Sequence, residues 1–481
     1  MIKIEGCRPG LRVMTIACAF LSGCTVGPNY HAPDMKVKTR WPKDEVSSAA
    51  TRPSLTAGEA PSEEWWKAFN DPHINGLVSR AMKSSYDVKM SADRVLQSRA
   101  QNTVVVGREL PNLNAGGTYD YYRRSGPLAA VRPGDYQWFY YGFDSSWELD
   151  LFGGIRRAIE SSTASYQATI EASRGVRVTL AAEVVRHYIE LRASQRRLKI
   201  ANDNLRYQEH TLSITRQRLA AGVVTDLDVS RATSLVAATR ATIPPLKSDE
   251  KRSIRSISVL LGEDPDSLVA ELSAPAPIPS PPHRLSVGLP ADLLRRRPDL
   301  RQAERQLAAA TSRIGVATAD LYPHLSLLGN LGAHDVQTSD LFTWSRRHAG
   351  IGPSISWNIF DAGRTRARID VEKASTAEAI AHYEKTLLDA VAETENEMTG
   401  LNNERDRAQS LRESVDANRQ SVSIGSQLYL RGITDFITVL DAERSLATSE
   451  DALALSDEAI GIHAVSLCKA LGGGWTTTEQ K

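Results

Sequence analysis

Residues that commonly carry out chemistry are few and isolated in this chain. It has ten histidines, six methionines and four cysteines among 481 residues, and it contains no HExxH, GKS/T or GxSxG motif. His187 and His463 lie at helical, core-facing spacing, and we interpret them as packed or solvated side chains rather than metal ligands. The glycines at 472–474 follow a helix and not a strand, so they mark a helix end instead of a nucleotide loop. We expect no catalytic residue and no metal site, so the protein is predicted not to be an enzyme.

The charge balance argues against a second class of function. The formal net charge is +1, and charged residues make up 24% of the chain. The sequence has no run of lysine and arginine interleaved with aromatic residues, which a nucleic-acid-binding surface would need. We therefore expect no nucleic-acid partner.

Cys24 is the one residue with a specific chemical prediction. An apolar run, Val13–Leu21, follows three basic residues; it is too short to span a bilayer but suits the core of a secretory signal. The run ends in Leu21-Ser22-Gly23-Cys24, which resembles the bacterial lipobox. Residues 1–23 are therefore predicted to be a lipoprotein signal peptide. Cleavage would leave Cys24 at the mature N-terminus with an N-palmitoyl group and an S-diacylglycerol, and we expect no other cofactor.

The residue after Cys24 predicts the membrane that receives this lipid. It is Thr25 and not an aspartate, which in lipoproteins implies delivery to the outer membrane. One acyl cluster anchors a protein but does not span the bilayer. The alternative is a chance cysteine after a soluble leader, and the sequence leaves open whether translation starts at Met1 or Met14.

The longest predicted element is a helix over residues 154–221, about 100 Å long at the rise of an α-helix. It contains no proline. Leucines recur every seven residues from Leu191 to Leu219, and a second row of Ile200, Tyr207 and Ile214 lies two positions further on. Two such rows, about 200° apart, imply two packing seams. A helix with two seams contacts a neighbour on each side, like a stave in a curved wall.

The chain contains this helix twice. A second long helix is predicted over residues 363–431, where the seven-residue row runs from Leu387 to Tyr429. Equivalent residues in the two copies are separated by about 210 positions, well beyond the helices themselves. The matched pairs include Trp147 with Trp357, Gly222 with Gly432, Ala232 with Ala442, and Leu261-Gly262 with Leu471-Gly472. The chain is therefore predicted to be a tandem duplication.

Each half is also predicted to contribute one β-hairpin, over residues 112–150 and 324–361. After Pro111, and again after Pro323, the apolar period changes from helical to two. Strands of about ten residues, with aromatic ends and small residues on the alternate face, suit a transmembrane β-barrel. The alternative is a soluble hairpin. Because four strands cannot close a barrel, several chains would have to pool their strands.

The predicted boundaries follow from these elements. Residues 24–70 are expected to form an extended N-terminal segment on the equatorial surface, 273–290 a stiff Pro-rich connector, and 476–481 a tail. The first repeat spans 71–272 and comprises a helix, hairpin 112–150, long helix 154–221 and return helix 225–261. The second repeat spans 291–475 and comprises a helix, hairpin 324–361, long helix 363–431 and return helix 435–471. Pro244-Pro245 is expected to kink or break the first return helix.

Several stretches resemble one protein family, the TolC-like outer-membrane factors of tripartite efflux systems, and in particular their OprM/NodT-type lipoprotein branch. The resemblance covers nearly the whole chain. It rests on the mature start Cys24–Tyr30, the strand end Trp147–Gly153, the second-half start Arg297–Arg301, and the helix turn with Gly432–Asp435 and Val439–Ala442.

The resemblance implies a fold, a location and partners. The fold is mainly α with a transmembrane β part: a homotrimer with a 12-stranded β-barrel in the outer membrane, joined to a 12-stave α-helical coiled-coil tunnel in the periplasm with a mixed equatorial belt. The partners are a periplasmic adaptor, an inner-membrane pump expected to be of the RND type, and outer-membrane lipid. The implied function is passive conduction of small molecules from adaptor and pump to the outside.

The resemblance also assigns roles to residues at the two helix turns. Gly222 and Val223, and Gly432 and Ile433, are expected to form the rim that docks onto the adaptor; the alternative is an ordinary helix end without a partner.

A gate is implied beside the second turn. Tyr429 and Asp441 match the tyrosine and an acidic position that close the tunnel in the family, and Asp435 stands just past the same turn. Arg431 and Arg444 are the nearest cations. For Asp435 the alternative is a plain helix N-cap.

One alternative function comes from a different class. A lipid-anchored periplasmic coiled-coil scaffold without transport activity would account for Cys24 and for the long helices, but it leaves the aromatic hairpins unused. The sequence does not identify the exported compound or the class of pump.

Overall fold

The computed structural model describes residues 25–35, 38, 40–42, 46, 54–56, 62–124, 134–282, 284–335 and 343–475. These residues fall into two compact units. The first unit comprises the described parts of Met1–Asp34, Val95–Thr169 and Gln302–Tyr383, and the second comprises those of Met35–Arg94, Ile170–Arg301 and Glu384–Lys481. Cys24 and the tail at 476–481 lie outside the described residues.

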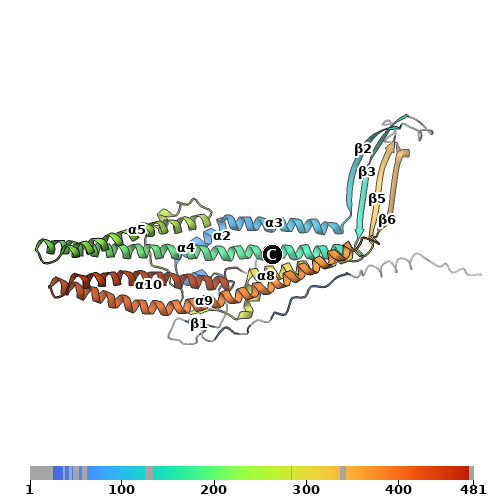
Figure 1. Cartoon of the computed structure of the whole chain (residues 1–481). Helices are drawn as coiled ribbons and strands as arrows, with labels where there is room; N and C mark the ends of the chain where they lie inside the picture. The colour runs from blue at the N-terminus through green and yellow to red at the C-terminus, as the bar shows by residue number, and fades with distance from the viewer. Residues whose placement is uncertain are drawn as a thin grey trace, which may run out of the picture. The chain divides into compact units, whose positions relative to one another are not determined.

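The first unit contains a four-stranded antiparallel sheet (Figure 1). Its strands are β2 (Asn112–Arg124), β3 (Gly134–Leu149), β5 (His324–Asp335) and β6 (Arg347–Ser356), in the order β2-β3-β5-β6. The two predicted hairpins are therefore present, and β3 pairs with β5 to join them. β2 and β6 form the two edges of the sheet.

Residue parity is continuous across this sheet. Every register pair joins two even-numbered or two odd-numbered residues: Thr118 faces Tyr140, and Tyr140 faces His334. Directly opposed residues share a face, so all even-numbered side chains lie on one face and all odd-numbered ones on the other. The odd face is mostly apolar and exposed; examples are Leu113, Phe143, Leu331, Ile351 and Ile355. The even face carries Asn, Asp, Ser, Thr, His and several glycines, together with the aromatic residues Trp138 and Tyr140.

Helices adjoin the strands in the same way in both repeats. α3 (Tyr86–Val106) and a short 3-10 turn, η2 (Gly107–Glu109), precede β2, while α8 (Pro298–Ala319) precedes β5. The indole Nε1 of Trp147 donates to the Glu109 carbonyl at 2.8 Å, and that of Trp357 donates to the Leu321 carbonyl at 3.1 Å. Each tryptophan thus satisfies a carbonyl at the end of the preceding helix, as the duplication predicts.

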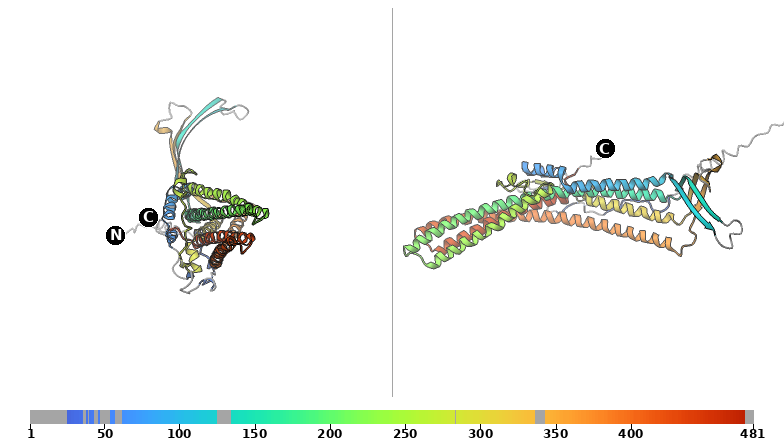
Figure 2. Two further views of the ribbon diagram at one scale, coloured as in Figure 1. Left: turned by 90° about the vertical axis from the view of Figure 1, so that its left-hand side faces the viewer. Right: turned by 90° about the horizontal axis from the view of Figure 1, so that it is seen from above.

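The second unit is built on four long helical segments (Figure 2). α4 (Gly154–Ala220) and α9 (Arg364–Leu430) enter it from the first unit, and α5 (Asp226–Leu260) and α10 (Phe436–Ala470) lie wholly within it. The seven-residue row of α9 runs from Leu387 to Tyr429, and all of its members are buried except Val422, which is half-buried. The predicted seam is therefore confirmed.

The sequence predicts a kink or break of α5 at Pro244-Pro245, and a break is wrong, because the helix is continuous from Asp226 to Leu260 with both prolines inside it. Ile243 and Leu246, on either side of the prolines, are buried with Ala201 of α4. Packing on both sides therefore offsets the two backbone hydrogen bonds that the prolines cannot donate.

Shorter elements complete the second unit. β1 (Ser54–Thr56) pairs in parallel with β4 (Arg284–Ser286), so the N-terminal segment contacts the Pro-rich connector. The remaining elements are η1 (Trp65–Phe69), α2 (Pro72–Ser84), α6 (Val269–Leu272), η4 (Pro290–Asp292) and α7 (Leu293–Arg296), while η6 (Trp344–Arg346) precedes β6 in the first unit. α2 is not among the sequence predictions, although Asp71 caps its first N–H groups and Pro72 occupies its first position.

Among the described residues, no helix combines the length and the hydropathy of a membrane-spanning helix.

Candidate functional site

The two turns that join the long helices have nearly the same backbone geometry. At the first, Gly222 has φ 74° and Val223 N donates to the Arg218 carbonyl at 2.9 Å. At the second, Gly432 has φ 72° and Ile433 N donates to the Leu428 carbonyl at 2.9 Å. This is the Schellman pattern, in which a residue with positive φ lets the chain fold back on the last carbonyls of the helix. The glycines predicted at these turns therefore serve the backbone.

Each turn exposes an apolar side chain. Val223 is 60% exposed and Ile433 is 66% exposed in the single chain. In a Schellman turn the residue at this position often packs back onto its own helix, so exposure leaves an apolar tip available to another molecule. Leu227 and Leu430 are exposed nearby. Each helix tip thus presents an apolar surface, and its role in docking stays a prediction.

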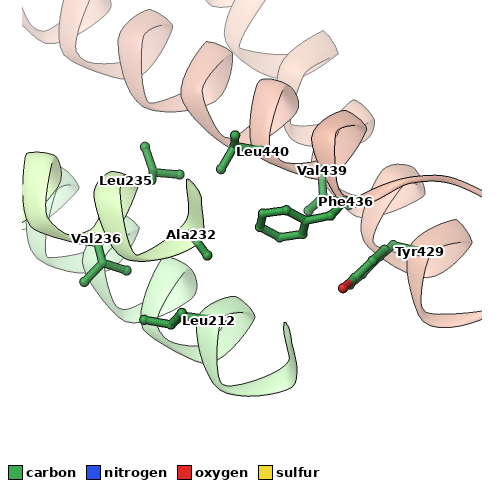
Figure 3. Close-up of a cluster of buried hydrophobic side chains, with 8 residues drawn as sticks. All are labelled: Leu212, Ala232, Leu235, Val236, Tyr429, Phe436, Val439 and Leu440. Carbon is green, nitrogen blue, oxygen red and sulfur yellow. The ribbon is translucent and has the colours of Figure 1, made fainter. Parts of the chain in front are cut away.

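Behind the turns, one apolar cluster holds all four long helices together (Figure 3). α4 contributes Leu212, α9 contributes Tyr429, and α5 and α10 contribute the rest: Ala232, Leu235, Val236, Phe436, Val439 and Leu440. The rings of Tyr429 and Phe436 lie 5.6 Å apart between their centroids. The cluster fixes the two helical hairpins to one another near their tips.

Tyr429 is held from the other repeat. The Arg218 guanidinium lies over the Tyr429 ring at 4.3 Å from its centroid, and Arg218 Nη1 donates to the Tyr429 carbonyl at 2.6 Å. The tyrosine is 4% exposed, and its hydroxyl has no hydrogen-bond partner within the described chain. Arg218 is not among the functional residues predicted from the sequence. Its counterpart in the second repeat is Leu428, so comparison of the two repeats does not single it out.

The two predicted gate carboxylates do not join Tyr429 in one contact. Asp435 and Asp441 are exposed, and within the described part of the chain neither forms an ion pair with Arg431 or Arg444. Asp435 occupies the N-cap position of α10, but its side chain makes no capping hydrogen bond. The corresponding residue of the first repeat is Thr225, whose backbone N–H donates to Asp228 at 3.0 Å. Both carboxylates are therefore available to a neighbouring molecule.

A cleft of about 850 Å³ lies beside the cluster, between α4, α9 and α10. Its wall includes Tyr429, Glu443 and Gln208, whose side-chain carbonyl also lacks a partner within the described residues. Thr211 donates to Glu443 at 2.8 Å, and burial raises the pKa of the Glu443 carboxyl. The cleft therefore combines buried polar groups with apolar side chains of the cluster, such as Tyr429 and Val439.

The residues that follow Cys24 are fixed where the first long helix begins. Val26 N donates to the Phe152 carbonyl at 3.1 Å, and Arg157 donates to the Val26 carbonyl at 3.1 Å and to Asn29 Oδ1 at 2.7 Å. Gly27 has φ 87°, and a Cβ there would lie 2.4 Å from Gly315 Cα. The segment that follows Cys24 is therefore held at the junction of β3 and α4.

The sequence predicts isolated histidines, and this is correct for His187 and His463 but not for His334 and His348. His187 Nδ1 contacts Glu190 at 2.8 Å, and His463 Nδ1 contacts Glu397 at 2.7 Å, as packed polar residues do. His334 and His348, however, lie together, with 3.2 Å between their Nδ1 atoms. The β5–β6 register brings them close, and reading that register from the hairpin pattern would have revealed the pair. In the described part of the chain, no group of three or more His, Cys, Asp or Glu residues could hold a metal ion.

Comparison with known proteins places these features in context. The model of the family described as outer membrane efflux protein matches residues 77–263 and 289–473. Nodulation protein T of Rhizobium leguminosarum bv. trifolii is 30% identical over 467 residues, covering 95% of each chain. The antibiotic efflux pump outer membrane protein ArpC of Pseudomonas putida is 29% identical over 467 residues, covering 96% of this chain and 95% of that protein.

Solved structures agree with the sequence comparison. The outer-membrane channel OprN superposes with a TM-score of 0.87 at 37% identity, covering 94% of this chain and all of that one. The match extends over both repeats.

Proposed function

The chain belongs to the outer membrane efflux protein family, and on this premise we propose that three copies of it assemble into the exit channel of a tripartite efflux system. It is an outer-membrane protein through which small molecules leave the cell. The homotrimer, the periplasmic adaptor, the RND-type pump and the lipid anchor are parts of the proposal.

The parity of the sheet is the observation that supports the channel best. An exposed apolar face suits contact with lipid, and a polar face with several glycines suits a water-filled lumen. The edges β2 and β6 leave backbone groups unpaired within one chain, and lipid offers these groups no hydrogen bonds. Pairing β6 of one copy with β2 of the next satisfies both edges, and three copies give the twelve strands that the family resemblance implies. A lipid-anchored scaffold without transport activity has no use for such a sheet.

The adaptor is proposed to dock on the two turns. Val223 and Ile433 expose apolar side chains at turns of the same geometry, so each copy presents two equivalent tips. The glycine before each of them lets another backbone come close. Six tips would then surround the periplasmic rim of a trimer.

The gate is proposed to lie at the same end of the helices. Around a threefold axis, Asp435 and Asp441 would each form a ring of three carboxylates, which a cation or an arginine of a neighbouring copy would have to offset. Tyr429 acts differently in this proposal: it holds α9 and α10 to α4 through Arg218, so opening requires that contact to change.

Cys24 is proposed to carry the lipid. The residues after it are held at the start of α4, directly after the last residues of β3. Because β3 crosses the membrane in this proposal, acyl chains on Cys24 would enter the bilayer at its periplasmic surface. The anchor and the sheet then attach to the same membrane at the same level.

One set of measurements tests the central proposal. The full-length protein, purified from outer-membrane fractions, should run as a heat-modifiable trimer and should form ion-conducting channels in planar bilayers. Deletion of the gene should sensitise cells to exported compounds. Two results together would favour the scaffold: purified protein that is monomeric and conducts no ions, and a gene deletion that leaves efflux unchanged.

A further inference from the structure

Two histidines that are distant in the sequence lie side by side on the even face of the sheet. His334 stands near the end of β5, and His348 stands near the start of β6. Their Nδ1 atoms are 3.2 Å apart, and their ring centroids are 5.0 Å apart. Both belong to the end of the sheet that is remote from the first residue of β5, where α8 leads in.

The register of the sheet explains why the two rings meet. His348 lies directly opposite Gly332, which has no side chain to occupy the space beside the imidazole. His334 lies directly opposite Tyr140 on its other side. The Trp138 ring stacks on His334 at 4.9 Å between centroids, and the Tyr140 ring lies 6.0 Å from that of His348. These neighbours restrict the rotation of both imidazoles and hold the pair in place.

The distance between the two nitrogens has a chemical meaning. Imidazole nitrogen binds Zn²⁺ at about 2.0–2.1 Å, so two such ligands at a tetrahedral angle lie about 3.3 Å apart. A separation of 3.2 Å also fits a hydrogen bond in which one ring donates to the other. The two arrangements need nearly the same spacing between the nitrogens, so a metal ion can replace the shared proton once each ring turns to aim its lone pair at the ion.

We propose that His334 and His348 form a two-imidazole binding site for a divalent transition-metal ion such as Zn²⁺, Ni²⁺ or Cu²⁺. Imidazole favours these ions over Mg²⁺ and Ca²⁺, which prefer oxygen ligands. In the described residues no third His, Cys, Asp or Glu completes a cluster, so the site as described supplies two protein ligands. Metal binding needs only the single chain; the location of the site at the channel mouth rests on the proposed function.

A bound ion would change the charge of the even face. Each occupied site adds two positive charges to a face that carries the carboxylates of Asp120, opposite Trp138, and of Asp144, which accepts from Tyr140. Three copies would add six such charges around one opening. Cations passing through would be repelled and anions attracted. Transition-metal ions should therefore lower the cation preference of the channel when they are applied from the side that holds this end of the sheet.

The binding test uses the full-length protein in detergent, without a polyhistidine tag. Titration calorimetry with Ni²⁺ should give one ion per chain, and Mg²⁺ should give no binding. His334→Asn and His348→Asn remove one ligand each. Loss of a group that only supports a ligand lowers metal affinity roughly 10- to 100-fold, so loss of a ligand should lower the Ni²⁺ affinity by at least that factor.

His324→Asn is the matched control. His324 lies on the same even face at the other end of β5, where its Nδ1 contacts Glu148 at 2.8 Å. This variant should bind Ni²⁺ as the unaltered chain does. Absence of binding, or binding that survives both His334→Asn and His348→Asn, would overturn the site. Ion conductance is measured separately in planar bilayers, so failure of the metal site leaves the channel function to be judged by its own result.

Discussion

The guanidinium of Arg218 covers the ring of Tyr429 and donates to the carbonyl of the same residue, so one side chain of the first repeat holds the end of the long helix of the second. The contact lies at the last turn of α4 and of α9, behind the two helix tips. Any movement that separates the two helical hairpins near their tips must break it.

Replacing Arg218 should loosen this end of the helices. Arg218→Ala removes a cation–π contact and a charge-assisted hydrogen bond, together about 1–2 kcal/mol. We expect a higher open probability in planar bilayers and a lower melting temperature. Arg216→Ala, at an exposed position two residues earlier, is the control. An unchanged open probability in Arg218→Ala would show that the contact does not restrain opening.

Tyr429→Phe makes a sharper comparison at the same contact. The hydroxyl is buried without a partner in the single chain, and such a group costs free energy. Its removal should leave stability unchanged or raise it, while the ring keeps its place under Arg218. If the variant instead opens like Arg218→Ala, the hydroxyl must have a partner in the assembled trimer.

Asp441→Ala should raise single-channel conductance and weaken block by divalent cations. The carboxylate is exposed and unpaired in the described chain, so a ring of three would repel itself and attract a cation. Asp435→Ala should have a smaller effect, because this residue also stands at the N-cap of α10. Unchanged conductance and block in the double variant would place the constriction elsewhere.

Gly432→Trp should abolish export but leave the trimer intact. The bulky ring blocks the rim, and the positive φ of Gly432 is strained for an L-residue with a large side chain. Gly432→Asn is the control, since asparagine tolerates this backbone conformation better. Crosslinking to the adaptor should map to Val223 and Ile433. Crosslinks confined to the β2–β3 connection would show that the opposite end of the protein faces the adaptor.

Cys24→Ser should remove lipid and spare part of the export activity. The lipobox-like tetrad ends at this thiol, and the sheet supplies a second attachment to the membrane. Labelled palmitate should enter the unaltered chain and not the serine variant. Equal labelling of both would assign the lipid to another residue.

Glu458 should make stability depend on pH. Burial, followed by the nearby Glu190 carboxylate, raises the pKa of Glu458 to about 7. The folded chain therefore holds a proton that the unfolded chain has lost, and stability falls as pH rises from about 4.5 through about 7. Glu458→Gln should flatten this part of the melting-temperature profile and stabilise the protein near pH 8, whereas exposed Glu384→Gln should leave the slope unchanged. A slope that persists in Glu458→Gln would assign the effect to another group.

The sequence predicted the repeating elements well because their signals are local or periodic. The seven-residue rows marked the buried face of α9, and the shift between repeats located both helix turns, where Gly222 and Gly432 adopt the same φ. Pro244-Pro245 misled because intrinsic propensity ignores the packing of Ile243 and Leu246. The Arg218–Tyr429 contact depends on which helices become neighbours, and single-sequence periodicity does not contain that information. The His334–His348 pair depends only on the register within one predicted hairpin.

The unbroken parity of the sheet has a consequence for how this protein can change. In every strand the odd-numbered side chains lie on one face of the sheet and the even-numbered side chains on the other, so the four strands share one two-residue repeat. Inserting a single residue into β5 would move Leu331 to the polar face and His334 to the apolar face along the remainder of that strand, and the error would pass to the pairing of β6. Inserting two residues would only lengthen the strand. Natural variation in strand length should therefore come in steps of two, and single insertions should be confined to the connecting loops.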